Sequence, residues 1–131
     1  MPNDPVPCVL LVEDEPLIRM LTVDMLDHLG FAAIEAASGA EALALDDEAL
    51  KSVAGLMIDL GLPDGPGEEV ARRLRQRRPD LPVILTTGAD ASAARAGLAG
   101  EGPVGVLEKP YQLNDLIRAL DTLKAAARGV A

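Results

Sequence analysis

Residues 55–67 read GLMIDLGLPDGPG: an apolar run ends at a single acid, Asp59, and then enters a loop rich in glycine and proline. Glycine and proline interrupt regular structure more strongly than other residues do. A short apolar run bounded in this way predicts a buried strand that runs into a loop. Asp59 is therefore expected at the carboxyl end of that strand, where open α/β sheets bind their ligands. One strand leaves open whether this acid is a hydrogen-bonded loop carboxylate or a reactive group.

Four other short apolar runs predict strands, and segments with helical spacing separate them. The further strands are expected at residues 8–12, 31–37, 82–86 and 104–107. The helices are expected at about 16–29, 40–50, 68–77, 90–98 and 112–127. Strands that alternate with helices predict a parallel sheet covered on both faces and joined by right-handed crossovers. The predicted fold is α/β, a flavodoxin-like (βα)5 doubly wound sheet with strand order 2-1-3-4-5.

Local signals support several of these elements. Pro16 suits the first position of a helix, where its missing N–H has no helical partner, and Ser38 could cap the second helix. The helix at 90–98 has Leu98 as its only large apolar residue, so we expect it to be poorly anchored and the most mobile element. The inward face of the last helix is expected to carry Leu113, Leu116, Ile117, Leu120 and Leu123.

Composition limits the classes of protein. With 131 residues, 49% of them hydrophobic and 25% charged, the chain is long enough for one domain with a real core. We expect a single domain over residues 1–131, with an extended lead-in at 1–7 and the core at 8–127. Since no DNA-binding or enzymatic segment follows the last predicted helix, we expect a stand-alone protein or a module from a larger kinase.

Charge and cysteine content exclude several functions. The net charge of −9 argues against nucleic acid or an anionic membrane as the main partner, because phosphate binding needs clustered cations. The single Cys8 rules out an intrachain disulfide, and no Cys/His set for zinc is present. No apolar stretch is long enough to span a membrane, and the start lacks the features of a secretory signal. The cytoplasm is the expected location.

The predicted strands deliver their polar residues to one edge of the sheet. The first strand leads to Glu13 and Asp14, the third to Asp59, the fourth to Thr87 and the fifth to Lys109. At 4 Å, like charges repel by ~1 kcal/mol in water and by up to ~4 kcal/mol at an effective dielectric constant of 20. A divalent cation or the lysine would compensate for this repulsion. An incomplete set of oxygen ligands fits Mg²⁺ (or Mn²⁺).

This pattern resembles the receiver domain of bacterial two-component response regulators. The motifs stand in order over essentially the whole chain: LLVEDE at 10–15, MIDLGLPDGPG at 57–67, PVILTTG at 82–88 and LEKPY at 107–111. Each motif is weak alone, but four in the right order, each at the end of a predicted parallel strand, are specific.

The resemblance implies a role for each residue. Asp59 would be the phosphoacceptor. Asp14, Asp59 and the Gly61 carbonyl would bind Mg²⁺ directly, while Glu13 would act mainly through a bound water. Lys109 and Thr87 would contact phosphoryl oxygens, with Thr86 as an alternative hydroxyl, and Pro110 would follow a cis peptide bond.

The resemblance also implies partners and a departure. The phosphoryl donor would be a sensor histidine kinase or a phosphotransfer protein, and phosphorylation would switch contacts with a downstream protein. The protein would be a regulatory domain and not an enzyme, and a monomer or weak dimer. Many receivers carry Tyr or Phe three residues before the lysine, where this chain has Val106, so this chain lacks the usual aromatic switch residue.

Two alternatives remain at this point. A phosphatase of the haloacid-dehalogenase type also uses a strand-end aspartate, Mg²⁺ and a lysine, but it has a second aspartate where this chain has Gly61, and usually a cap domain. A receiver-like module that is never phosphorylated would not need the complete residue set. Outside the site, we expect an exposed His28, a core Cys8 and a solvated helix face that carries Arg72, Arg73, Arg75, Arg77 and Arg78.

Overall fold

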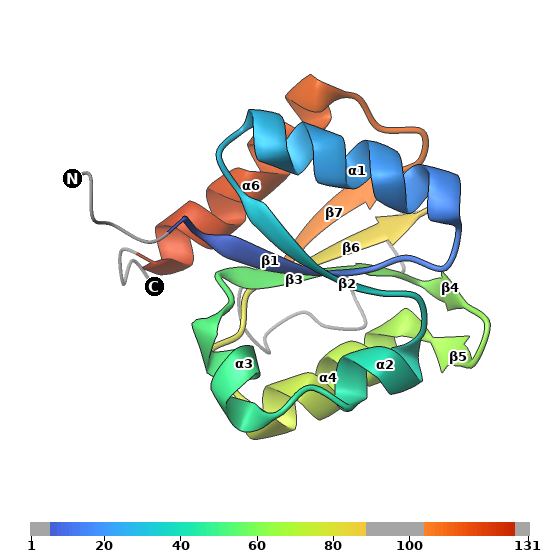
Figure 1. Ribbon diagram of the computed structural model, residues 1–131, viewed down its shortest axis with the longest axis vertical. Coiled ribbons are helices and arrows are strands. Elements are labelled where there is room, and N and C mark those ends of the chain that lie inside the picture. Colours follow the sequence, from blue (N-terminus) through green and yellow to red (C-terminus); the bar gives the residue numbers. More distant parts are fainter. Residues whose placement is uncertain (1–5, 89–103, 128–131) are drawn as a thin grey trace.

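The computed structural model describes residues 6–88 and 104–127, and its centre is a five-stranded parallel sheet (Figure 1). The strands are β1 (Cys8–Val12), β2 (Ala32–Ala36), β3 (Gly55–Asp59), β6 (Val83–Thr87) and β7 (Val104–Glu108). Their order across the sheet is β2-β1-β3-β6-β7, and every neighbouring pair is parallel. The predicted 2-1-3-4-5 order and flavodoxin-like fold are confirmed.

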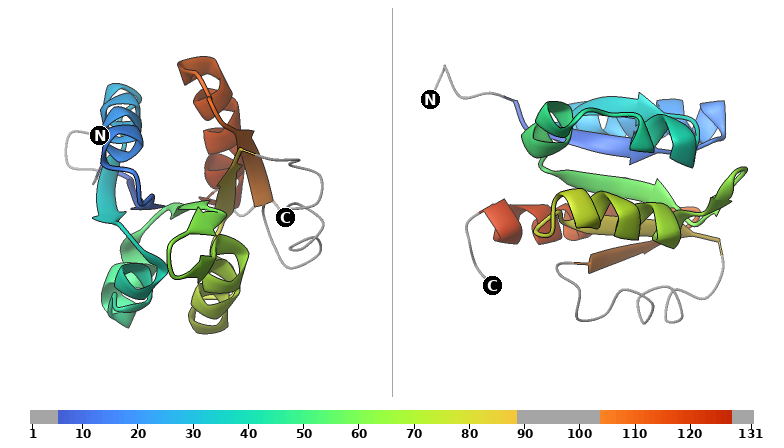
Figure 2. Two further views of the ribbon diagram at one scale, coloured as in Figure 1. Left: turned by 90° about the vertical axis from the view of Figure 1, so that its right-hand side faces the viewer. Right: turned by 90° about the horizontal axis from the view of Figure 1, so that it is seen from below.

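Helices cover both faces of this sheet. Helices α1 (Pro16–His28) and α6 (Leu113–Ala127) lie on one face (Figure 1). Helices α2 (Gly39–Leu43), α3 (Asp47–Ser52) and α4 (Gly67–Arg77) lie on the other, as the first view of Figure 2 shows. No helix in the part of the chain that the structure describes is long and apolar enough to cross a membrane.

The central strands are apolar throughout because both of their faces are buried. Alternate residues point to opposite faces, so Leu10, Leu56 and Val83 pack with the layer of α2, α3 and α4. Val9, Met57 and Ile84 pack with α1 and α6. Each of these six side chains is fully excluded from solvent. This two-sided burial fixes the register that brings the strand ends together.

The expected single helix at 40–50 is wrong, because the chain forms two short helices there. Ser38 caps α2 as predicted, with its hydroxyl oxygen accepting from the Glu41 N–H at 3.2 Å. Helix α2 ends at Leu43, and the carboxylate of Asp46 then caps α3 by accepting from the Ala49 N–H at 2.8 Å. An aspartate competes for backbone donors and favours a new start over continuation of the helix.

Other differences concern exposure. Ile117, expected inside, is 39% exposed, and Leu21 on α1 is 52% exposed. Arg75, expected on a solvated face, is buried, and its Nε donates to the Leu81 carbonyl at 3.0 Å. Cys8 is only half-buried, whereas His28 is exposed as expected. The predicted helix at 90–98 lies outside the described residues.

A two-stranded hairpin follows β3 and was not predicted. Strands β4 (Gly61–Leu62) and β5 (Gly65–Pro66) pair antiparallel and join β3 to α4. Pro63 and Asp64 form its tip, and Gly65 adopts a positive φ of 138°, which glycine tolerates at little cost. The glycine and proline residues of the opening motif therefore build a compact, hydrogen-bonded loop directly beside Asp59.

Candidate functional site

Three carboxylates meet at the carboxyl edge of the sheet. Asp59 ends β3, and Glu13 and Asp14 directly follow β1, which lies beside β3 with Val12 opposite Ile58. The three side chains offer oxygen atoms that all lie within 4.8 Å of one another. Asp59 and Glu13 are only 7% and 2% exposed, whereas Asp14 is half-buried. The predicted gathering of these acids at one edge of the sheet is confirmed.

Lys109 bridges two of these acids. It follows β7, and its Nζ lies 2.9 Å from Glu13 Oε1 and 3.0 Å from Asp59 Oδ2. The next peptide bond, Lys109–Pro110, is cis, as predicted. The sequence suggested that the lysine would compensate for crowded carboxylates, and the ammonium group does so directly. The contact with Glu13 was not foreseen.

The pKa values of this cluster reflect burial and pairing together. Burial raises the pKa of Glu13 and outweighs the opposing effects of the Lys109 ammonium and the Glu15 N–H. Burial alone would lower the pKa of Lys109, but its hydrogen bonds to Glu13 and Asp59 raise it above the ordinary value. The lysine therefore stays charged, and its one ammonium group contacts two of the three clustered carboxylates. The excess of negative charge favours a further cation.

Backbone groups hold the carboxylates in place. The Gly61 N–H donates to Asp59 Oδ1 at 3.2 Å, and the Glu15 N–H donates to Glu13 Oε2 at 3.1 Å. A side chain at Gly67 would collide with the carbonyl group of Asp59, so the start of α4 can approach β3 only because residue 67 is glycine. Asp59 is thus fixed by its own loop on one side and by Lys109 on the other.

Two buried threonines lie at the end of β6. Thr86 is opposite Asp59 in the register of the sheet, and Thr87 is opposite Glu108. Both are almost fully buried. Thr87 also binds Lys109 through the backbone, because the Lys109 N–H donates to the Thr87 carbonyl at 2.8 Å. The structure therefore places both predicted hydroxyl residues at the acidic edge.

Arg19 contacts a backbone group of the site, and Tyr111 makes a hydrogen bond beside it; the sequence singled out neither role. Arg19 Nη1 donates to the Glu13 carbonyl at 2.8 Å, while its Nε contacts Glu35 at 3.2 Å. The Tyr111 hydroxyl lies 2.6 Å from Thr22 Oγ1, which itself donates to the Ile18 carbonyl. Burial raises the pKa of Tyr111. The Tyr111–Thr22 contact has no local sequence signal, because it joins residues 89 positions apart in the chain.

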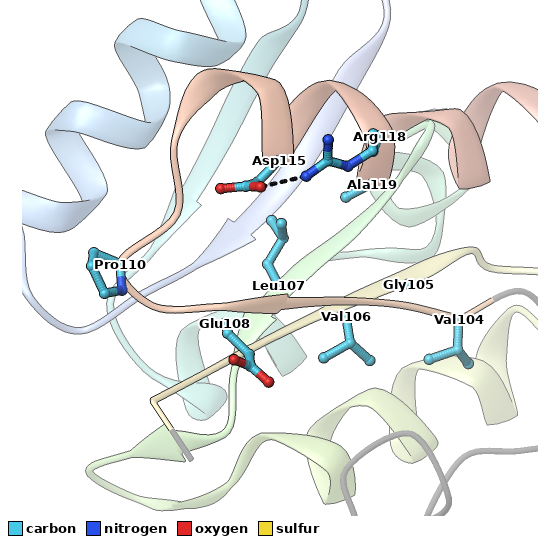
Figure 3. Close-up of a pocket in the computed structure, with 9 residues that line it drawn as sticks. All are labelled: Val104, Gly105, Val106, Leu107, Glu108, Pro110, Asp115, Arg118 and Ala119. Atoms are coloured by element: carbon cyan, nitrogen blue, oxygen red, sulfur yellow. Dashed lines mark hydrogen bonds and ion pairs between the residues drawn. The ribbon is translucent and has the colours of Figure 1, made fainter. Parts of the chain in front are cut away.

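The expected departure at Val106 is visible on β7. Figure 3 shows Val104 and Val106 on one side of the strand and Leu107 on the other, beside the Asp115–Arg118 ion pair. A hollow of about 480 Å³ lies along this strand, but neither Asp59 nor Lys109 lines it. Val106 packs against the core cluster of the α2, α3 and α4 layer. This hollow is separate from the acidic cluster of Glu13, Asp14 and Asp59.

The arrangement can hold a small divalent cation. Carboxylate oxygens are the preferred ligands of Mg²⁺ and Mn²⁺, and Mg²⁺ accepts one or two carboxylates while it keeps several waters. The three acids lie close enough for one ion, and Lys109 leaves their cluster negative. The fold and this site together define a flavodoxin-like α/β domain with a carboxylate cluster and one lysine at the carboxyl edge of its sheet.

Comparisons with known proteins identify the family. The response regulator receiver domain profile matches residues 9–121. The chain is 31% identical over 119 residues to the response regulator receiver protein CpdR of Brucella abortus, covering 91% of this chain and 98% of CpdR. It is also 37% identical over 108 residues to the sensor kinase CckA of the same organism, covering 82% of this chain. The chain belongs to the response regulator receiver domain family of two-component systems.

A solved structure supports the fold. The CheY-like receiver domain protein from Methanospirillum hungatei matches with a TM-score of 0.82 and 23% identity, covering 95% of this chain and 99% of that one. Several curated relatives are much longer than the matched region. The chain spans 11% of the sensor kinase and 59% and 48% of two other relatives.

Proposed function

We propose that this chain is the phosphoacceptor domain of a two-component or phosphorelay system, with Asp59 as the acceptor. The observation that supports it best is the position of Asp59, which is buried and bound by Lys109 at 3.0 Å next to two further acids. Structural carboxylates rarely gather in this way without a charge to balance them. The family of the chain and its complete residue set favour a phosphorylated module.

In the proposed reaction, a carboxylate oxygen of Asp59 attacks the phosphorus of a phosphohistidine on a partner. The O–P bond forms as the N–P bond breaks, and the electron pair returns to the imidazole nitrogen, which takes up a proton. The product is an acyl phosphate on Asp59. Phosphoryl transfer depends mainly on positioning and charge neutralisation, so the protein needs no further nucleophile.

Asp14, Asp59 and the Gly61 carbonyl would hold Mg²⁺ (or Mn²⁺) directly, and Glu13 would act through a water. The bound ion would neutralise charge on the phosphoryl oxygens. Lys109 would exchange its contact with Asp59 for one with a phosphoryl oxygen, and Thr87 would donate its hydroxyl to another. Thr86 is the alternative donor because it lies directly opposite Asp59.

The acyl phosphate would act as a signal. It adds about −1.5 to −2 units of charge and strong hydrogen-bond acceptors, which Lys109 and Thr87 can contact. It would therefore shift the balance between two conformations and change contacts with a downstream protein. The donor would be a sensor histidine kinase or phosphotransfer protein in the cytoplasm. We propose a regulatory role without turnover of substrate, and a monomer or weak dimer.

The test is phosphorylation by a small donor. The protein is incubated with Mg²⁺ and acetyl phosphate, and intact mass is recorded over time. We expect the mass of one phosphoryl group in the wild type and none in Asp59→Asn. Asp24→Asn, which alters an exposed acid on α1, should keep the gain. A gain that survives Asp59→Asn, or catalytic release of phosphate from esters, would reject the proposal.

A further inference from the structure

Asp64 makes an unusual contact for an exposed acid. Its carboxylate oxygens accept from the Gly39 N–H at 3.0 Å and the Ala40 N–H at 2.8 Å. These donors are the first two backbone groups of α2, 25 and 24 residues away in sequence. The two hydrogen bonds, from Gly39 first and Ala40 second, lower the pKa of Asp64. One aspartate therefore ties the tip of the β4–β5 hairpin to a helix in the same layer.

The two hydrogen bonds of Asp64 add to the N-terminal cap that Ser38 already gives α2. Ser38 satisfies the Glu41 N–H, while Asp64 satisfies the two donors before it. Space is also tight here, because a side chain at Gly39 would come within 2.7 Å of Val70 on α4. The start of α2, the hairpin tip and α4 thus form one packed corner.

The hairpin connects this corner to the candidate metal site. Gly61 begins β4 opposite Pro66, and the Gly67 N–H closes the base by donating to the Leu60 carbonyl at 3.0 Å. Gly61 is exposed, and its N–H reaches back to Asp59. Glycine has more backbone conformational freedom than any other residue type, so the Gly61 backbone needs outside contacts to hold it. A hairpin that is fixed at both base and tip would hold the Gly61 carbonyl in one orientation.

We propose that Asp64 is a positioning residue for the metal site: by binding the amino terminus of α2 it fixes the hairpin that orients the Gly61 carbonyl. This inference rests on the proposed function, because that function assigns the carbonyl to the ion. Residues that orient metal ligands without touching the metal typically change its affinity 10- to 100-fold when they are removed. Asp64 lies three residues from Gly61, so the low end of this range applies.

The experiment measures Mg²⁺ binding to the unphosphorylated full chain by isothermal titration calorimetry. We expect Asp64→Ala to raise the dissociation constant about tenfold. Asp64→Asn keeps one acceptor oxygen and should give an intermediate value. The matched control is Asp46→Ala, which removes a carboxylate cap from α3 by the same chemistry. That control should bind Mg²⁺ within about twofold of the wild type. Urea unfolding of each variant tests whether it is folded.

The outcomes separate this inference from the proposed function. An unchanged dissociation constant in Asp64→Ala, with normal binding in the wild type, overturns the positioning role and leaves the proposed function intact. Equal weakening by Asp64→Ala and Asp46→Ala also overturns it, because loss of a helix cap would then explain both. A wild-type protein that binds no Mg²⁺ rejects the metal site itself. If Asp64→Ala does not fold, the graded loss expected in Asp64→Asn decides the question.

Discussion

Cationic side chains meet oxygen acceptors in two regions of this molecule, and the acceptors differ. At the carboxyl edge of the sheet, Lys109 contacts the carboxylates of Glu13 and Asp59. At the end of α4, Arg77 and Arg78 pair with the exposed acids Asp47 and Asp80, but most of their hydrogen bonds go to backbone carbonyls in and after α2 and α3. Carbonyls carry no net charge and need only a donor with the right geometry.

The difference between carboxylate and carbonyl acceptors distinguishes contacts suited to a functional site from contacts that stabilise the fold. Carboxylates that crowd together repel, and a single ammonium does not neutralise three of them. The carboxylate cluster is therefore suited to a second cation or to a transferred group that replaces the contacts of Lys109. The guanidinium groups of α4 are planar forks that make several hydrogen bonds at once, which suits permanent contacts. Under the proposed function the contacts of Lys109 would change on phosphorylation, whereas those of Arg77 and Arg78 would stay as they are.

The largest effect is expected from Lys109→Gln, which removes the ammonium group from the acidic cluster. The ammonium would stabilise charge on the transferring phosphoryl group, so phosphorylation by acetyl phosphate should slow about 10²-fold. That factor equals about 2.7 kcal/mol of activation free energy. Time courses of intact mass at fixed Mg²⁺ would measure it. Lys51→Gln changes an exposed lysine on α3 and should have no effect. A rate within threefold of the wild type would show that Lys109 is only structural.

The second largest effect is expected from Arg78→Gln, which tests the carbonyl contacts at the end of α4. Arg78 Nη1 donates to the Leu50 carbonyl at 2.9 Å and to the Val53 carbonyl at 2.6 Å, and the side chain is 18% exposed. Hydrogen bonds from charged donors contribute about 1.5–3 kcal/mol each. Because the Arg78 side chain is partly exposed, water replaces part of the two bonds that are lost, and the free energy of unfolding should fall by about 2 kcal/mol. Urea denaturation would measure the loss, while the phosphorylation rate should not change.

The control for Arg78 lies on the same helix. Arg73 is 62% exposed and contacts Glu69 at 3.8 Å, a surface pair. Arg73→Gln should cost less than about 0.5 kcal/mol, because solvent screens such pairs. If the two variants lost the same stability, the carbonyl contacts of Arg78 would contribute nothing beyond surface charge.

The same contrast explains what could be predicted from the sequence. The strand ends could be located because apolar runs and their bounding residues are local signals. Parallel topology then brings Glu13, Asp59 and Lys109 to one edge, which places these residues without any knowledge of contacts. The carbonyl contacts of Arg78 and the contacts of Asp64 depend on partners about 25 residues away, so a linear pattern does not reveal them. From sequence alone, an arginine-rich helix is expected to face solvent, because the segments that supply its acceptors are not known.

The break between α2 and α3 has a similar origin. The segment 40–50 is rich in alanine and leucine and contains no glycine or proline, so its local propensity favours one helix. The structure instead uses Asp46 to start a new helix, and Arg77 donates to the carbonyls of Leu43 and Leu45 at the break. Those carbonyls find a donor only because α4 packs against this turn. Tertiary contacts therefore outweigh local propensity here.

A smaller effect than that of Arg78→Gln is expected from Arg77→Gln, which tests whether solvent exposure weakens the carbonyl contacts at the end of α4. Arg77 donates to the carbonyls of Leu43 at 3.2 Å and Leu45 at 2.6 Å and also contacts Asp47, which is 74% exposed. Its side chain is more exposed than that of Arg78, so water can replace part of what is lost. The free energy of unfolding should fall by about 1 kcal/mol, near the average for one hydrogen bond. A urea titration beside Arg78→Gln would measure it. A loss as large as that of Arg78→Gln would mean that exposure does not weaken these carbonyl contacts, and that the turn between α2 and α3 depends on Arg77 more than its solvent access indicates.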